Sequence, residues 1–205
     1  GGSVTGELVV TALATFSPML APILTAFREE HPDLTVRFLT GDRLFRLEYG
    51  EAHVALRAGA PPDQPDNVVQ PFGAQGLALY ASESYIKRHG LPSDESEFGD
   101  HYFVGHDDEI RAPFNIWLRD TVPLENIIYR TSDNRTVEDG VVAGAGIGFL
   151  PVQLAKRLDK LTQVIPPRDE WAAPMWLVTH VALHRPAKVQ SFLPFHKEAV
   201  RDWEM

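Results

Sequence analysis

The beginning of the chain alternates apolar runs with amphipathic segments in a strand–helix–strand–helix–strand order. Residues 8–10 form a short apolar run, and residues 34–40 place apolar side chains at every second position, so both segments predict strands. The segment between them, at about residues 16–30, has apolar residues three or four positions apart, which predicts a helix with one buried face. These helix positions are Phe16, Leu20, Ile23, Leu24 and Phe27.

A second crossover is predicted directly after the second strand. Residues 42–49 suit a short helix that ends at Gly50, and residues 54–56 form a third strand that leads into Arg57. Alternation of this kind builds a parallel sheet with helices on its faces. Such sheets bind ligands at the carboxyl ends of their strands. In this sequence those ends carry Ala14 and Thr15, then Thr40, Gly41 and Asp42, and then Arg57.

The remainder of the chain keeps the same alternation. We expect strands at residues 77–80, 102–104, 127–129 and 176–178, with a further short strand before Pro151. We expect helices at residues 82–89, around 114–118, at 137–143 and at about 186–203, and a surface loop at 60–67. The pattern therefore predicts an α/β protein of two subdomains joined by a hinge. Subdomain I is expected to span residues 1–79 plus 181–205, and subdomain II residues 80–180.

Composition narrows the classes of function. The 205 residues are 44% hydrophobic, enough for a proper core, and the formal net charge is -9. An acidic chain lacks the basic patch of a nucleic-acid-binding module, although DNA binding by a part outside this sequence stays open. The absence of cysteine excludes disulfides and thiolate metal sites and is compatible with the cytoplasm. No membrane span or signal peptide is expected, and residues 1–3 are set aside as a cloning remnant.

Two patterns that suggest enzyme chemistry have simpler explanations. Gly144, Gly146 and Gly148 follow a helix and precede a strand, whereas a dinucleotide-binding loop lies between a strand and a helix. Close packing and positive φ at a helix end explain these glycines better. None of the candidate nucleophiles Ser17, Ser132 and Ser191 lies in a G-x-S-x-G elbow. We therefore expect no catalytic residues, no cofactor and no enzyme activity.

The acidic stretch at residues 94–109 offers candidate metal ligands. His101 and His106 stand near Asp107, Asp108 and Glu109. An odd separation of five residues puts the two histidines on opposite faces of a strand that continues through both. A solvated acidic loop is therefore favoured over a metal site.

Helix starts that follow strands give a stronger functional signal. The segments concerned are Thr15 with Ser17, Thr40 with Asp42, and Ser132 with Asp133 and Asn134. Hydroxyls and free backbone N–H groups at such places suit a small anion or another polar ligand. Ordinary helix capping explains the same residues, with Thr15 or Ser17 capping the first helix and Pro18 in its first turn.

Five stretches, in order, carry motifs of one family. Residues 6–34 contain Gly6, Leu8, Val10 and His31-Pro32, and residues 47–57 read LEYGEAHVALR. The others are LYASESYIKRHGLP at 79–92, VVAGAGIGFLP at 141–151, and WLVTH at 176–180 followed by VQSFL at 189–193. Together they resemble the effector-binding domain of LysR-type transcriptional regulators, over nearly the whole chain.

The resemblance implies a fold like that of type 2 periplasmic binding proteins, with two Rossmann-like subdomains around a cleft. In the family this cleft binds a small effector, often an organic acid or an aromatic metabolite. The effector contacts that the resemblance implies are Ala14, Thr15, Thr40 and Gly41 from one lobe, Ser132, Asp133, Asn134, Gly146 and Phe149 from the other, and Arg57 and Tyr80 near the hinge. Arg57 favours an anion, whereas Asp42 and Asp133 disfavour one if they face the cleft.

The resemblance also implies partners. An N-terminal winged helix-turn-helix outside this sequence would bind DNA, in a cytoplasmic homodimer or higher oligomer with no membrane contact. In the family these domains pair antiparallel, with the first helix (residues 17–30) and a second-lobe helix packing against a neighbour's strand. A stand-alone solute-binding protein of similar fold and an enzyme on this scaffold are the alternatives. An upstream signal peptide would indicate the former, and steady turnover of a bound metabolite the latter.

Two positions depart from the family pattern. His53 stands where the family usually has Asp, and Glu83 where it usually has Pro. The histidine puts in question a local hydrogen bond near the start of the third strand. A titrating histidine there would add pH sensitivity, whereas a passive surface histidine is the simpler interpretation.

Overall fold

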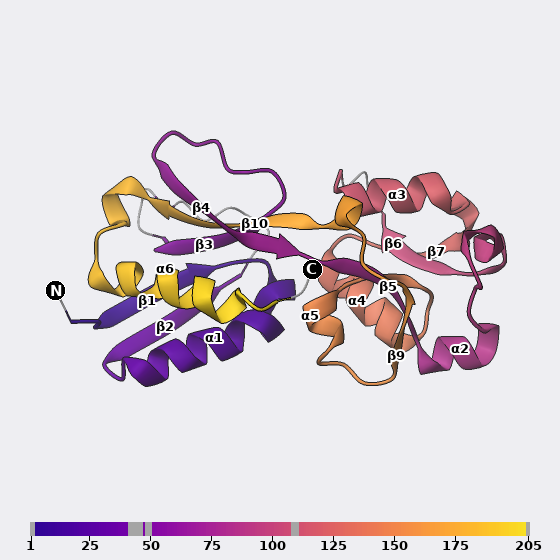
Figure 1. The fold of residues 1–205 in the computed structure, drawn as a ribbon, viewed down its shortest axis with the longest axis horizontal. Coiled ribbons are helices and arrows are strands. Elements are labelled where there is room, and N and C mark those ends of the chain that lie inside the picture. The colour runs from indigo at the N-terminus through magenta and orange to yellow at the C-terminus, as the bar shows by residue number, and fades with distance from the viewer. Residues whose placement is uncertain (1–2, 41–46, 48–50, 108–110, 204–205) are drawn as a thin grey trace. The chain divides into compact units, whose positions relative to one another are not determined.

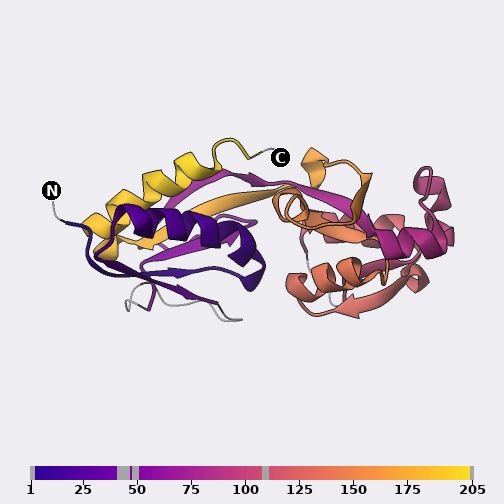
Figure 2. The ribbon, with the colours of Figure 1, turned by 90° about the horizontal axis from the view of Figure 1, so that it is seen from below.

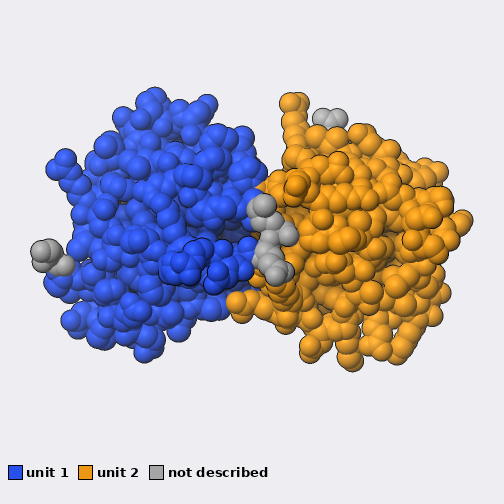
Figure 3. Space-filling view, in the orientation of Figure 1, with its two compact units in different colours: residues 1–74, 174–203 blue, residues 75–173, 204–205 orange. Residues whose placement is uncertain are grey.

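The computed structural model describes residues 3–40, 47, 51–107 and 111–203 (Figure 1). They form two compact units, coloured separately in Figure 3. Unit 1 comprises residues 1–74 and 174–203, and unit 2 comprises residues 75–173 with 204–205. Each unit has its own strands and its own core, so each is described by itself.

Unit 1 is built on a five-stranded sheet in the order β2-β1-β3-β10-β4. Its strands are β1 (Gly6–Thr11), β2 (Leu34–Leu39), β3 (Val54–Ala58), β4 (Asn67–Gln75) and β10 (Ala173–His180). β1 is parallel to both β2 and β3, which confirms the prediction from the opening pattern, and β10 is antiparallel to β3. The parallel register brings the carboxyl ends of β1 and β2 to one edge, where Thr11 pairs with Leu39.

Helices α1 (Ser17–Glu30) and α6 (Ala187–Val200) lie side by side on this sheet (Figures 1 and 2). α1 buries the apolar stripe expected of it, and its Phe27 is fully buried. The Phe27 ring meets the rings of Phe192 and Phe195 of α6 at centroid distances of 5.3 and 5.2 Å. These edge-to-face contacts join the two helices in the unit 1 core. Short 3₁₀ helices, η1 (Ala14–Phe16) and η6 (Val181–Leu183), precede them.

Unit 2 contains two small sheets. β5 (Leu77–Ser82) lies between β8 (Gly148–Pro151) and β9 (Leu161–Ile165) and is antiparallel to both. β6 (Phe103–His106) is parallel to β7 (Ile127–Thr131). The remaining elements are α2 (Glu83–His89), η3 (Glu95–Asp100), α3 (Pro113–Thr121), η4 (Leu124–Asn126), α4 (Asn134–Ala143), α5 (Val152–Ala155) and η5 (Asp169–Trp171).

Aromatic rings dominate the unit 2 core. Trp171 is fully buried, and its ring centroid lies 4.9 Å from those of both Trp117 and Phe149. The guanidinium of Arg168 lies 4.8 Å above the Trp171 ring and makes an ion pair with Glu95 at 2.8 Å. The arginine therefore covers the outer side of the aromatic cluster while its charge is neutralised.

Both crossings between the units fall before the predicted boundaries at 79/80 and 180/181. The strands explain the difference. Residues 77–79 pair with β8 in unit 2, and residues 175–178 pair with β3 in unit 1. The sequence-based division places residues 75–79 in subdomain I and residues 174–180 in subdomain II, whereas their contacts group them with the other unit.

Two strands lie where no strand was expected. β4 contains Pro71 and Gly73, which weaken a strand pattern, and it is half-exposed along most of its length. β9 is short, has polar residues in its middle, and is stabilised by pairing with β5. Most other predicted strands and helices are present within a few residues of their expected ends. The predicted helix at 42–49 lies outside the described residues, apart from the buried Leu47.

Candidate functional site

Unit 1 gathers polar residues at the carboxyl edge of its parallel strands. η1 follows β1 and carries the exposed Ala14 and the buried Thr15. Thr40 follows β2 and is exposed. Because β1 and β2 are parallel and in register, these segments leave the sheet at the same edge. Gly41 and Asp42, predicted at this place, lie outside the described residues.

The start of α1 uses no side-chain cap. Its cap position is Phe16, whose backbone is already helical, because η1 runs directly into α1. Capping by Thr15 or Ser17 is therefore wrong, since the extended residue that precedes the helical turns is Leu13, which has no capping side chain. Pro18 does lie in the first turn, as predicted, where its missing N–H removes one unpaired donor.

β3 carries Arg57 near its carboxyl end. The side chain is half-buried, and burial lowers the pKa of its guanidinium. No described carboxylate forms an ion pair with it. A bound anion would stabilise a half-buried guanidinium of this kind, because a carboxylate can accept paired N–H donors from it.

His53 makes a specific contact immediately before β3. Its ring Nδ1 accepts a hydrogen bond from the Val9 backbone N–H at 2.8 Å. The backbone N–H of His53 donates to the Val9 carbonyl, also at 2.8 Å. The local hydrogen bond questioned from the sequence is therefore present, with a ring nitrogen as the acceptor. Burial lowers the pKa of His53, as does Lys188, whereas Glu7 raises it. His53 is thus a structural acceptor, not a passive surface residue.

Unit 2 presents a second polar edge at the ends of β6 and β7. His106 pairs with Thr131, and the Asp107 N–H donates to the Thr131 carbonyl at 2.7 Å. The imidazole of His106 is buried, and its Nε2 bonds to Oδ1 of Asn134 at 2.7 Å. Burial lowers the pKa of His106, while its bond to Asn134 acts in the opposite direction. A buried histidine therefore fixes the residue at which α4 begins.

The segment before α4 is held by its own hydrogen bonds. Asp133 caps the helix as predicted, since its carboxylate accepts from the Thr136 N–H at 2.8 Å and from the Thr136 hydroxyl at 2.9 Å. These bonds lower the pKa of Asp133. The hydroxyl of Thr131 donates to the Asp133 carbonyl at 3.0 Å. The exposed Ser132 stands at the tip of this ordered turn.

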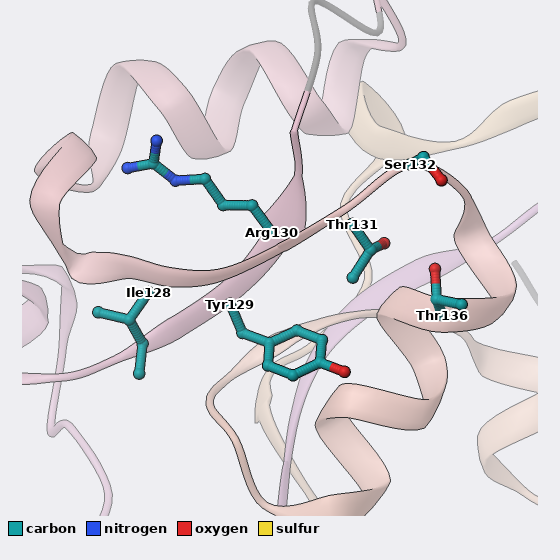
Figure 4. A pocket seen from close by; sticks show the side chains of 6 residues that line it. All are labelled: Ile128, Tyr129, Arg130, Thr131, Ser132 and Thr136. Carbon is teal, nitrogen blue, oxygen red and sulfur yellow. The ribbon is translucent and has the colours of Figure 1, made fainter.

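A groove of about 590 Å³ runs along β7 and this turn. It is lined by Ile128, Tyr129, Arg130, Thr131, Ser132 and Thr136. Figure 4 shows the hydroxyl-bearing side chains directed toward the start of α4, while Ile128 and Arg130 lie at the other end. Arg130 donates to the carbonyls of Ile127 at 2.8 Å and Leu124 at 2.7 Å, so backbone oxygens satisfy part of its guanidinium. The hydroxyl end is the part of the groove suited to a small polar ligand.

Three other predicted contacts of unit 2 have packing roles in the structure. Tyr80 is buried in β5, where its hydroxyl accepts from Gln163 at 3.2 Å. Phe149 belongs to the aromatic core. A Cβ on Gly146 would lie 2.9 Å from the Phe103 backbone, so glycine is required for close approach of two chain segments. As effector contacts these three residues stay predictions.

The two histidines proposed as metal ligands have separate partners. His101 Nδ1 bonds to the Tyr85 hydroxyl at 2.7 Å, and that hydroxyl accepts from the Tyr102 N–H at 3.0 Å. Both His101 and His106 are buried, so neither lies in a solvated loop as the sequence suggested. Within the described residues no group of three potential ligands could hold a metal ion.

The structure thus brings Ala14, Thr15, Thr40 and Arg57 to one edge of unit 1, and Ser132, Asp133 and Asn134 to one edge of unit 2. Sequence reasoning missed Tyr129, Thr136 and the role of His106. The available signal was that His106 and Thr131 each end or follow a predicted strand. Parallel pairing of those two strands would have placed them together.

Comparisons with known proteins agree on one family. The family description "LysR substrate binding domain" matches residues 1–201. An HTH-type transcriptional regulator of Xanthomonas campestris pv. campestris (strain 8004) is 37% identical over 81 residues, covering 38% of this chain and 23% of that protein. The HTH-type transcriptional regulator CbbR of Rhizobium meliloti (strain 1021) is 25% identical over 180 residues, covering 82% and 57%.

A solved structure supports the fold. The regulatory domain of CrgA, a LysR-type transcriptional regulator from Neisseria meningitidis, has a TM-score of 0.79 at 21% identity, covering 95% of this chain and 98% of that one. The chain spans at most 57% of the length of the two curated relatives described above. In the described residues, no helix combines the length and apolar character needed to cross a bilayer.

Proposed function

Because this chain belongs to the LysR substrate-binding domain family, we propose that it is the sensing part of a DNA-binding transcriptional regulator. Its fold is the type 2 periplasmic-binding-protein-like fold of those regulatory domains. In this proposal the chain binds a small molecule without converting it. Binding would shift the balance between conformations and so change DNA binding by a helix-turn-helix domain outside this sequence.

The groove on unit 2 is the single observation that carries the proposal. Its volume of about 590 Å³ falls in the range of small-molecule sites. Hydroxyls at the start of α4 supply hydrogen-bonding groups at one end, and a helix N-terminus adds a partial positive charge. Internal hydrogen bonds through Asp133 and Asn134 hold these groups in place, which lowers the entropy that binding must overcome.

Arg57 in unit 1 suggests the charge of the effector. Its cation is half-buried at the carboxyl edge of the parallel strands, near the segments of Ala14, Thr15 and Thr40. We therefore propose an effector that bears a carboxylate or another anionic group. The carboxylate of Asp133 is directed at the Thr136 N–H and hydroxyl, and these donors offset part of its negative charge.

Screening by thermal shift tests the proposal. Small organic acids and neutral polar metabolites are added to the chain, and the affinity of each stabilising compound is then measured by calorimetry. We expect Ser132→Ala and Thr40→Ala to weaken binding about threefold to tenfold, the value of one net hydrogen bond. Arg57→Gln should weaken binding of an acid more strongly than that of its neutral amide.

Thr162→Val provides the control, because Thr162 is an exposed threonine of unit 2 on β9, away from the groove. Its affinity should equal that of the parent. A hit that binds Ser132→Ala, Thr40→Ala and Arg57→Gln with the parent affinity would contradict the proposed edges. Conversion of the hit to a product during incubation would contradict the non-enzymatic role.

Dimerisation is the second part of the proposal. The outer face of α1 exposes small side chains at Ala21, Thr25 and Ala26, which permit close approach of another element. On β7, Ile128 is 55% exposed, an apolar surface on a strand of the kind that a partner would cover. We propose that these surfaces pair two copies of the chain. Light scattering should show Ala21→Arg as a monomer and the control Thr162→Arg as a dimer like the parent.

A further inference from the structure

β6 and α3 hold two buried polar side chains with unused hydrogen-bonding capacity. His106, the last residue of β6, is 7% exposed, and Asn115, in the first turn of α3, is 5% exposed. His106 Nδ1 and Asn115 Nδ2 are both buried without a hydrogen-bond partner among the described residues. A buried polar group without a partner destabilises a folded protein, so two beside the same space indicate a missing partner.

Both side chains line one small cavity. Its other lining residues are Gly105, Leu118, Arg119 and Ile127, and its volume is about 10 Å³. That volume corresponds to roughly one water molecule, so the space admits a single polar atom with its hydrogens. A Cβ at Gly105 would lie 3.1 Å from Ile127 and 3.2 Å from Leu118. Glycine at this position therefore keeps the cavity open.

The hydrogen-bonding roles of the two groups are complementary. Nε2 of His106 bonds to Oδ1 of Asn134, which is an acceptor, so Nε2 carries the proton of the neutral ring. Nδ1 is then an acceptor, and the low pKa that burial gives His106 keeps it so near neutral pH. Asn115 Nδ2 is a donor. A carboxylate could not donate to Nδ1 and a cation could not accept from Nδ2, whereas a hydroxyl oxygen does both.

We propose that this cavity binds one hydroxyl group, which accepts from Asn115 Nδ2 and donates to His106 Nδ1. The oxygen belongs either to a resident water or to the alcohol group of a small ligand. Through His106 and Asn134 its occupant is linked to the turn before α4. The site itself is independent of the proposed function, and only its link to effector recognition depends on that function.

Crystallography of the chain separates the two sources. Crystals grown without alcohol should show a single density peak within about 3.2 Å of both His106 Nδ1 and Asn115 Nδ2. Crystals are then transferred to methanol as the probe. A peak that stays spherical identifies water, and a peak that gains a carbon identifies an alcohol site. No peak in either condition, or protein groups bonded to both atoms, would overturn the proposal.

Two variants test the same site in solution by the ¹⁵N resonances of the His106 ring. Asn115→Leu removes the donor at similar volume, and Gly105→Ala keeps both polar groups while crowding the space. In each variant we expect the Nδ1 resonance to move toward that of a nitrogen without a hydrogen bond, while Nε2 stays bonded to Asn134. Where the occupant is an alcohol, methanol should shift the Nδ1 resonance in the parent only; where it is water, methanol should leave that resonance unchanged. Unchanged Nδ1 resonances in both folded variants would contradict the site, even if effector binding to the groove proved real.

Discussion

The two units begin a helix after a parallel strand in two different ways. Each places a helix start after a strand of a parallel pair, α1 after β1 and α4 after β7. In unit 1 the backbone itself makes the turn, because η1 runs into α1 without a side-chain cap. In unit 2 side chains make it, through Asp133 and the His106–Asn134 bond.

This difference indicates which helix start can carry ligand-binding side chains without destabilising the fold. At the start of α4 the turn is already held by Asp133, so the neighbouring Ser132 hydroxyl is left for another molecule. At the start of α1 the buried Thr15 already has an interaction within the protein. Substitutions at the two starts should therefore differ in both stability and binding.

The largest expected effect is on the free energy of unfolding, and it distinguishes a packing residue of unit 2 from a proposed ligand-binding residue. Phe149→Ala removes a ring packed against Trp171, Trp117 and Phe114, and should lower the free energy of unfolding by about 3–5 kcal/mol. Ser132→Ala should leave it within about 0.5 kcal/mol, because Ser132 is exposed. Urea denaturation followed by tryptophan fluorescence measures both. A small loss for Phe149→Ala would contradict a packing role for Phe149 in the core of unit 2.

The second-largest expected effect is on the pH dependence of stability, and it follows from a comparison of two buried histidines. His106 has a partner on one nitrogen, whereas His196 of α6 is 1% exposed and has none on either nitrogen among the described residues. Burial lowers the pKa of His196 to about 4. The unfolded chain binds this proton near pH 6.5, so stability is fully present above that pH and is lost as pH falls toward 4. The loss should reach about 3 kcal/mol, with about 2 kcal/mol gone by pH 5.

His196→Leu tests this assignment. The substitution removes the titrating group while keeping an apolar side chain beside Phe72 and Phe192. Unfolding free energies between pH 7.5 and pH 5 should fall less in the variant than in the parent, by about 2 kcal/mol. Because His196 gives up no hydrogen bond, the variant should be at least as stable as the parent at pH 7.5. Parallel pH profiles would show that other groups set the acid sensitivity.

The sequence predicts the architecture best where the hydrophobic periodicity agrees with the residues that end helices and strands. The stripe of α1 and the alternation of β2 identify their elements directly, and Gly144, with φ of 88° after α4, confirms the helix end expected there. β4 and β9 could not be predicted in this way. Their stability comes from neighbours distant in the sequence, and Pro71 and Gly73 interrupt the local pattern of β4.

The candidate site is less readable from sequence than the fold. The cap at Asp133 follows from local chemistry and was predictable. The burial of His106 and its bond to Asn134, 28 residues away, depend on β6 and β7 pairing in parallel. His53 illustrates the same limit, since its contact with Val9 spans 44 residues and depends on the pairing of β1 with β3.

A smaller effect compares the two helix starts directly. Asp133→Ala removes the acceptor for two Thr136 donors and should destabilise unit 2 by about 1 kcal/mol. Ser17→Ala, at the uncapped start of α1, should change the unfolding free energy by less than about 0.5 kcal/mol. Chemical denaturation of both variants, with thermal melts in parallel, gives the comparison. Equal losses at the two positions would contradict a difference in how the starts are held.

The most direct test of the central claim is calorimetric titration of Ser132→Ala with a metabolite that stabilises the parent. Ser132 lines the end of the groove where the hydroxyl groups gather, and removal of its hydroxyl should leave the fold intact. The account predicts a dissociation constant raised about threefold to tenfold, with Thr162→Val equal to the parent. An unchanged dissociation constant for Ser132→Ala would show that the polar edge of unit 2 does not contact the effector.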